Sequence, residues 1–369
     1  MKRIFPWLHF LSAALAFNLL AGCNKTDTAT QDDGNAVIVS TFAGSGEAGD
    51  ADGTGSAAKF RLPHSIAIDA AGNLYVTDGG GQRIRKVTPK GEVSTFAGSG
   101  EIGYADGIGS AAQFSGPHGI AIDATGNLYV TDTFHHRIRK ITSKGEVSTL
   151  AGSEEGFSDG IGRNALFYRP YGIAIDAVSN LYVADTHNNL IRKVTPKGEV
   201  STLAGGNGLL EDGGFADGVG SDARFLRPSG IAIDAAGNLY VVDTHNNRIR
   251  KVTPNGEVST LAGSVEGFAD GSGCCTRFRI PAGIAIDAAG NLYVADSLNH
   301  RIRKVTPKGE VSTIAGSEQG FSDGPGIAAK FSYPSGIAID AAGNLYVADS
   351  LNSRIRKLVF VANPSSGKD

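Results

Sequence analysis

The tetrapeptide Ile-Ala-Ile-Asp recurs along this chain, and the repeat that it marks constrains the fold more than any other feature. Its copies begin at Ile66, Ile120, Ile173, Ile231, Ile284 and Ile337. Successive copies are therefore 54, 53, 58, 53 and 53 residues apart. Units of this length fold by packing against their neighbours in a stacked or radial array. Such an array is predicted here, in place of the two or three separate domains that 369 residues would otherwise suggest.

One unit, Ser65 to Gly98, predicts four short antiparallel strands. They are expected at Ser65–Asp69, Asn73–Asp78, Arg83–Thr88 and Glu92–Ala97. Gly and Pro between them favour tight turns. Both faces of the second strand are apolar, so each sheet is expected to be packed on both sides, as propeller blades are. One phenylalanine per connector is expected to wedge between neighbouring blades: Phe60, Phe114, Phe167, Phe225, Phe278 and Phe331.

The two ends of the chain complement each other. Val37–Ala43 has the sequence of the fourth strand of a unit, although no unit precedes it. The last unit supplies three strands, Gly336–Asp340, Asn344–Asp349 and Arg354–Phe360, and lacks the fourth. The N-terminal strand is therefore predicted to complete the last blade, which would cover two open sheet edges.

The segment PHGIAIDATGNLYVTDTFHHRIRKITSKGEVSTLAG, residues 117–152, resembles an NHL repeat, and six such units cover residues 37–360. The resemblance implies an all-β fold, a six-bladed β-propeller with four-stranded antiparallel blades. The propeller domain is predicted to span residues 37–361. A disordered tail is predicted to follow at 362–369.

The N-terminal segment resembles the export signal of bacterial lipoproteins. A basic start and an apolar stretch lead to Leu20-Ala-Gly-Cys23, which resembles a lipobox. Residues 1–22 are predicted to be a signal peptide, Cys23 to carry lipid, and the polar residues up to 36 to form a flexible tether. Acyl chains would hold the protein on a membrane. The expected location is the bacterial cell envelope, extracytoplasmic, and the outer membrane in a Gram-negative cell. The alternative is an uncleaved membrane anchor.

The charge pattern argues against a nucleic-acid partner. The net charge is −3, so no global basic field is present. Arg83, Arg85, Lys86 and the strand-end acid Asp78 recur in every unit with little change, and we interpret them as blade-edge pairing and solvation. The alternative is a basic track for RNA.

The connector acids are interpreted as turn caps, with Ca²⁺ ligation as the alternative. They are Asp52, Asp106, Asp159, Asp217, Asp270 and Asp323.

One end of the propeller carries most of the differences between units. The loops between second and third strands share this end with the connectors, whereas the other turns are nearly identical in all units. Apart from His9, every histidine falls at the variable end. The candidate ligand-binding face consists of Phe134, His135, His136, Tyr171, His187, His245 and His300.

Two functions are consistent with this face. The preferred hypothesis is a binding or scaffold module for an envelope protein, peptide or glycan, with no cofactor and no identified catalytic residue. The alternative is a metal-dependent lyase or lactonase, because lyases of related propeller families place metal-binding histidines on the axis. That resemblance implies a divalent metal on His64 and His118, with His136 or Tyr171 as proton carrier. A structural spacer is a third option.

Overall fold

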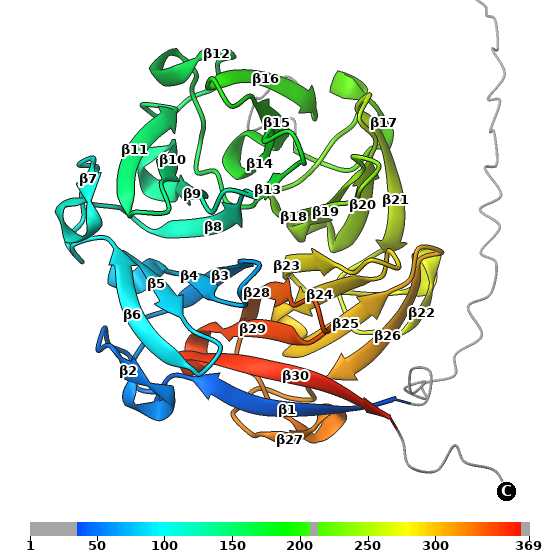
Figure 1. Ribbon diagram of the computed structural model, residues 1–369. Helices are drawn as coiled ribbons and strands as arrows, with labels where there is room; N and C mark the ends of the chain where they lie inside the picture. The colour runs from blue at the N-terminus through cyan, green and yellow to red at the C-terminus, as the bar shows by residue number, and fades with distance from the viewer. Residues whose placement is uncertain (1–34, 207–212, 363–369) are drawn as a thin grey trace, which may run out of the picture.

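The computed structural model describes residues 35–206 and 213–362, which form six antiparallel sheets around a central axis (Figure 1). The innermost strands are β3 (Pro63–Ile68), β8 (Pro117–Ile122), β13 (Ile173–Ile175), β18 (Pro228–Ile233), β23 (Pro281–Ile286) and β28 (Pro334–Ile339). The second strands are β4 (Leu74–Asp78), β9 (Leu128–Asp132), β14 (Leu181–Asp185), β19 (Leu239–Asp243), β24 (Leu292–Asp296) and β29 (Leu345–Asp349). The third strands are β5 (Arg83–Val87), β10 (Arg137–Ile141), β15 (Leu190–Val194), β20 (Arg248–Val252), β25 (Arg301–Val305) and β30 (Arg354–Ala362).

The outer part of each blade contains two further strands. The fourth strands are β6 (Glu92–Ala97), β11 (Glu146–Ala151), β16 (Glu199–Ala204), β21 (Glu257–Gly263), β26 (Glu310–Ala315) and β1 (Asn35–Ala43). The fifth strands are β2 (Gly53–Thr54), β7 (Gly107–Ile108), β12 (Gly160–Ile161), β17 (Gly218–Val219), β22 (Gly271–Ser272) and β27 (Gly324–Pro325). The sheets are thus five-stranded, where the sequence predicted four. The extra strand is a two-residue piece of connector that covers the outer edge, and so short a segment has no recognisable strand pattern.

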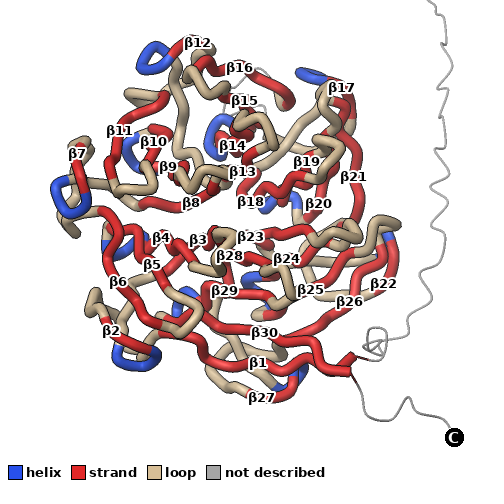
Figure 2. Tube along the Cα trace, in the orientation of Figure 1, coloured by secondary structure: helices blue, strands red, loops and turns tan. Residues whose placement is uncertain are grey.

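The described helices are all single 3₁₀ turns (Figure 2). One set follows the fifth strands: η1 (Gly55–Ala57), η3 (Gly109–Ala111), η5 (Gly162–Asn164), η8 (Gly220–Asp222), η10 (Gly273–Cys275) and η12 (Gly326–Ala328). The other set joins second to third strands: η2 (Gly79–Gly81), η4 (Thr133–His135), η6 (Thr186–Asn188), η9 (Thr244–Asn246), η11 (Ser297–Asn299) and η13 (Ser350–Asn352). Within residues 35–206 and 213–362, no helix has the length and hydrophobicity needed to cross a bilayer.

The N-terminal strand completes the last blade, as predicted. β1 lies between β27 and β30 in the sheet that also contains β29 and β28 (Figure 1). Its register pairs Asn35 with Ala362 and Val39 with Leu358. The paired strands therefore include residues that the sequence assigned to the tether and to the tail. The predicted signal peptide, Cys23, residues 24–34 of the tether and residues 363–369 of the tail lie outside the described residues.

The hydrophobic core is divided among the spaces between neighbouring blades. One cluster joins Phe60 and Leu74 of the first blade to Tyr346 and Ile355 of the last, and five similar clusters occupy the remaining interfaces. All six connector phenylalanines are fully buried there, which confirms the predicted wedge. Burying a Phe side chain contributes about 1.5–3 kcal/mol, so these wedges fix the blades relative to one another.

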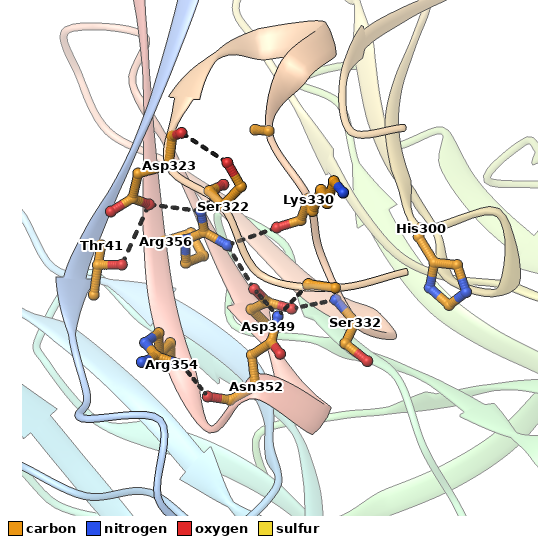
Figure 3. Close-up of polar contacts among 12 residues, drawn as sticks. Thr41, His300, Ser322, Asp323, Lys330, Ser332, Asp349, Asn352, Arg354 and Arg356 are labelled. Carbon is orange, nitrogen blue, oxygen red and sulfur yellow. Dashed lines mark hydrogen bonds and ion pairs between the residues drawn. The ribbon is translucent and has the colours of Figure 1, made fainter. Parts of the chain in front are cut away.

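Each blade also contains a buried arginine held between two aspartates. In the last blade, Arg356 Nη1 lies 2.7 Å from Asp349 Oδ2, and its Nη2 lies 2.6 Å from Asp323 Oδ1 (Figure 3). The guanidinium also stacks between Phe321 and Phe331, 4.9 and 5.0 Å from the ring centroids. The equivalent ion pairs centre on Arg85, Arg139, Arg192, Arg250 and Arg303.

This arrangement corrects two expectations. The second arginine of each unit pairs with the strand-end aspartate, as predicted, but both are fully buried, so the prediction that they are solvated is wrong. The connector acids bind the buried arginines, and caps on short turns are not their main role. Arginines enclosed in this way are also unavailable to a polyanion. These clusters could not be predicted from the sequence, because the two aspartates lie 7 and 33 residues before the arginine and meet it only after the blade has folded.

Candidate functional site

Two rings of side chains, one residue from each blade, surround the axis where the connectors enter the innermost strands. Both rings flank the proline that precedes Ile-Ala-Ile-Asp in every unit. The axial ring is the residue after that proline: His64, His118, Tyr171, Ser229, Ala282 and Ser335. The rim ring is the residue before it: Leu62, Gly116, Arg169, Arg227, Ile280 and Tyr333.

The rings enclose a cavity of about 510 Å³, a volume typical of ligand sites, which span about 300–1,000 Å³. The whole axial ring lines it, as does the rim ring except Arg169. Beneath the axial ring, the residues that follow it in the chain surround a much smaller space of about 40 Å³. In five blades that residue is glycine, and a Cβ there would clash with a carbonyl oxygen of the neighbouring blade. The cavity therefore narrows from the loop end of the propeller to a tightly packed floor.

An arc of stacked rings forms one side of the cavity. The ring centroids of His64 and His118 are 4.4 Å apart, and those of His118 and Tyr171 are 4.3 Å apart. The ring planes differ by only 19° and 16°. The other three blades supply two serines and an alanine at these positions. The cavity is therefore asymmetric, with the edges of three stacked rings on one side and small side chains on the other.

The histidines of this arc are neutral at physiological pH. Burial lowers the pKa of His64 to about 4. Burial, together with the neighbouring His64, holds the pKa of His118 well below its usual value. A neutral imidazole offers one hydrogen-bond donor and one acceptor. The arc therefore lines the cavity with polar ring edges and carries no charge.

The rim ring has a strained backbone. Five of its members are not glycine and still adopt left-handed φ angles between 47° and 59°: Leu62, Arg169, Arg227, Ile280 and Tyr333. This conformation is costly for a residue with a Cβ, and a following proline restricts the backbone further. Strain of this kind concentrates at functional sites. These positions were not predicted from the sequence. The available signal was that five different residue types precede the recurring proline in the six units.

Arg227 brings the positive charge into the cavity. Its Nη1 lies 2.6 Å from Nε2 of His187. Burial and the charge of Arg227 lower the pKa of His187 to about 4, so the imidazole is neutral and accepts this hydrogen bond. Among the described residues that line the cavity, none is an aspartate or glutamate. Arg169, the rim residue of the preceding blade, lies outside the cavity wall, with its guanidinium 5.3 Å from the ring centroid of Phe134.

The structure divides the residues of the predicted ligand-binding face into two groups. Phe134, Tyr171, His187 and His245 line the cavity, together with the predicted metal ligands His64 and His118. The remaining three do not line it: His135, His136 and His300.

These three histidines belong to the loops. His136 and His300 have left-handed φ angles of 58° and 55°, and the Nδ1 of each accepts a hydrogen bond from a rim-residue backbone N–H. Asn189 and Asn247 make the same bond with their side-chain oxygens in other blades. His135 Nδ1 lies 3.4 Å from Asp132. Loop geometry accounts for the contacts of His136 and His300.

The axial histidines do not fit a metal site. A metal ion lies in the plane of each imidazole that binds it, about 2.0–2.1 Å from the nitrogen. The parallel stacking of His64 on His118 directs their nitrogen lone pairs along separate planes, so they do not converge on one point. The described residues also contain no group of three or more His, Cys, Asp or Glu side chains arranged to hold a metal.

The sequence matches known proteins across the repeat region. The family model for the NHL repeat matches residues 60–87, 114–141, 225–252, 278–305 and 331–358. The Arabidopsis thaliana protein "SUPPRESSOR OF QUENCHING 1, chloroplastic" is 31% identical over 318 residues, covering 80% of this chain and 30% of that protein. "NHL repeat-containing protein 2" of Bos taurus is 31% identical over 347 residues, covering 80% of this chain and 46% of that protein. The chain thus spans less than half the length of these two relatives.

Solved structures share the fold at low sequence identity. An "auxiliary nutrient binding protein" from Bacteroides thetaiotaomicron superposes with a TM-score of 0.68 at 18% identity, covering 88% of this chain and 77% of that one. A streptogramin B lyase superposes with a TM-score of 0.56 at 16% identity, covering 88% of this chain and 98% of that one. Residues 167–194 of the third unit lie outside the family match but form the same strands as the other units. The chain is therefore a six-bladed β-propeller in which five of the six units match the NHL repeat.

Proposed function

We propose that the chain is a binding module that holds a protein, peptide or glycan partner at the loop end of the propeller, with part of the partner inserted in the axial cavity. One observation carries this proposal. The six units are nearly identical at their turns and buried clusters, yet they differ at the axial and rim rings. A residue type that recurs six times serves the blade, whereas residues that differ between blades can give one site its shape.

The physical character of the cavity supports binding. Aromatic rings supply contact area at little entropic cost, and polar groups fix orientation. The site is preorganised, because five of the six axial residues lie in the innermost strands, which contact one another around the axis (Figure 1). A rigid site of this kind loses little conformational freedom when a ligand binds. The fold is shared with a protein described as nutrient binding, and this likeness is consistent with the proposal.

Filling the cavity is expected to abolish binding. Ala282→Tyr places a ring at an axial position where the third blade already has Tyr171, so the backbone should accept it. On an array of peptides and glycans, we expect this variant to lose at least about tenfold of the signal that the wild type gives. This loss corresponds to about 1.4 kcal/mol.

The matched control is Ala236→Tyr, which adds the same ring at an exposed turn on the opposite end of the propeller. It should bind as the wild type does. Capture that survives Ala282→Tyr, or an array on which the wild type captures nothing, would contradict the proposal.

We also propose that the module is anchored outside the cytoplasmic membrane by lipid on Cys23. The lipobox-like segment supports this location, and acyl chains give durable attachment. In a bacterial expression host, the wild type should incorporate labelled palmitate and sediment with membranes. Cys23→Ala should lose the label, and a variant that begins at Asn24 should lose both properties. A wild type that sediments with membranes but carries no label would instead indicate an uncleaved anchor.

A further inference from the structure

We infer that the axial cavity binds a ring that carries a carboxylate, with the carboxylate on Arg227 and the ring against the arc of His64, His118 and Tyr171. This inference rests on the proposed function and specifies its ligand. A terminal uronic acid of a saccharide and a free aromatic acid share this chemistry.

The charge balance of the cavity favours an anion. Arg227 is half-buried, and in the described part of the chain no carboxylate pairs with it. Its side-chain hydrogen bonds go to His187, which is uncharged. A guanidinium has five N–H donors arranged in a fork, and a carboxylate matches two of them at once. The remaining donors can therefore receive an acid group without breaking an existing ion pair.

The same repeat position in the neighbouring blade shows what is particular to Arg227. Arg169 has the same backbone conformation, with φ of 48° against 52°. Its guanidinium stacks on Phe134, which is 52% exposed, and it does not line the cavity. Two arginines thus project from equivalent sites, and only Arg227 projects into the enclosed space.

The aromatic arc and the open side of the axial ring favour a ring next to the acid. The three rings stack 4.3–4.4 Å apart and cover one another's faces, so their edges line the cavity over three blades, and the face of a ligand ring can pack against such edges. Opposite the arc, small side chains at Ser229, Ala282 and Ser335 leave the room that a ring needs. The space below the axial ring is only about 40 Å³, so a ligand cannot pass through the axis. It therefore enters from the loop end, and only a ring at the end of a chain can reach the arc.

Isothermal titration calorimetry with three probes tests the inference: trigalacturonate, its methyl ester and ferulate. We expect trigalacturonate or ferulate to bind the wild type, and the one that binds identifies the source of the carboxylate. A hydrogen bond to a charged group is lost in the ester and in Arg227→Gln, so each should weaken binding roughly 10- to 100-fold. Arg169→Gln is the matched control and should change Kd by less than about threefold. Thermal melting of both variants checks that the propeller is intact.

The outcomes separate this inference from the proposed function. If neither acid binds, if the methyl ester binds as tightly as trigalacturonate, or if Arg227→Gln binds as the wild type does, the carboxylate assignment is overturned. Should array ligands still be captured in an Ala282→Tyr-sensitive way, the cavity remains a binding site and only its ligand class is wrong. If array capture is also lost, both proposals fail together.

Discussion

Replacing Asp349 with alanine is expected to lower the free energy of unfolding by roughly 3–5 kcal/mol, because three buried donors, one of them the Arg356 guanidinium, lose a charged acceptor. Asp349 is fully buried and accepts hydrogen bonds from Arg356 at 2.7 Å, the Ser332 backbone N–H at 2.7 Å and Asn352 at 2.9 Å (Figure 3). Alanine leaves all three donors without this acceptor. The partly exposed Asp323 remains as a second partner of Arg356, but it cannot reach the other two donors.

Urea denaturation followed by circular dichroism measures this effect. Burial raises the pKa of Asp349, so the experiment is run at pH 8, which favours the ionised carboxylate. Asp222→Ala, which removes an exposed aspartate from a connector, is the control and should change stability by no more than about 0.5 kcal/mol. A loss below about 1 kcal/mol for Asp349→Ala would show that the arginine cluster does not stabilise the blade in this way.

Val39→Asp is expected to destabilise the propeller by a similar amount, roughly 3–5 kcal/mol, because it places an unpaired charge in an apolar cluster. Val39 is 1% exposed and packs with Ile314 and Leu358. It lies in the centre of β1, the strand that joins the two ends of the chain. Loosening β1 also uncovers the edges of β27 and β30, so aggregation on partial unfolding is expected.

The control for this prediction lies one residue away on the same strand. Ser40 is exposed and pairs with Lys357, so Ser40→Asp should leave stability within about 0.5 kcal/mol of the wild type. The same urea titration compares the two variants. Equal stability of Val39→Asp and Ser40→Asp would mean that closure of the ring by β1 contributes little to the folded state.

The repeat made most of the fold predictable from the sequence. Spacing and turn residues located the four main strands of each blade, and the missing fourth strand of the last unit located β1. The fifth strand was not predicted, because two residues such as Gly324 and Pro325 are too short to show a pattern. The ion-pair clusters were also missed, since Arg356 and Asp323 are 33 residues apart and each looks like a surface residue by itself.

The site was predictable only in part. Its location at the variable end followed from comparing units, and Phe134, Tyr171, His187 and His245 do line the cavity. Position along the sequence could not distinguish them from His136 and His300, whose Nδ1 atoms accept hydrogen bonds from backbone N–H groups of the next blade. Arg227 was not recognised, because Arg169 has the same residue type and the same backbone angle, and only the direction of the side chain places one arginine in the cavity and the other on Phe134.

The central claim is that the axial cavity is the site where the propeller binds its partner, and a crystal structure with trigalacturonate or ferulate bound tests it most directly. The account predicts electron density for the ligand between Tyr171 and Arg227, with its carboxylate on the guanidinium. Ligand density on the outer rim, or at the opposite end of the axis near the Thr-Pro-Lys-Gly turns, with an empty cavity, would contradict it.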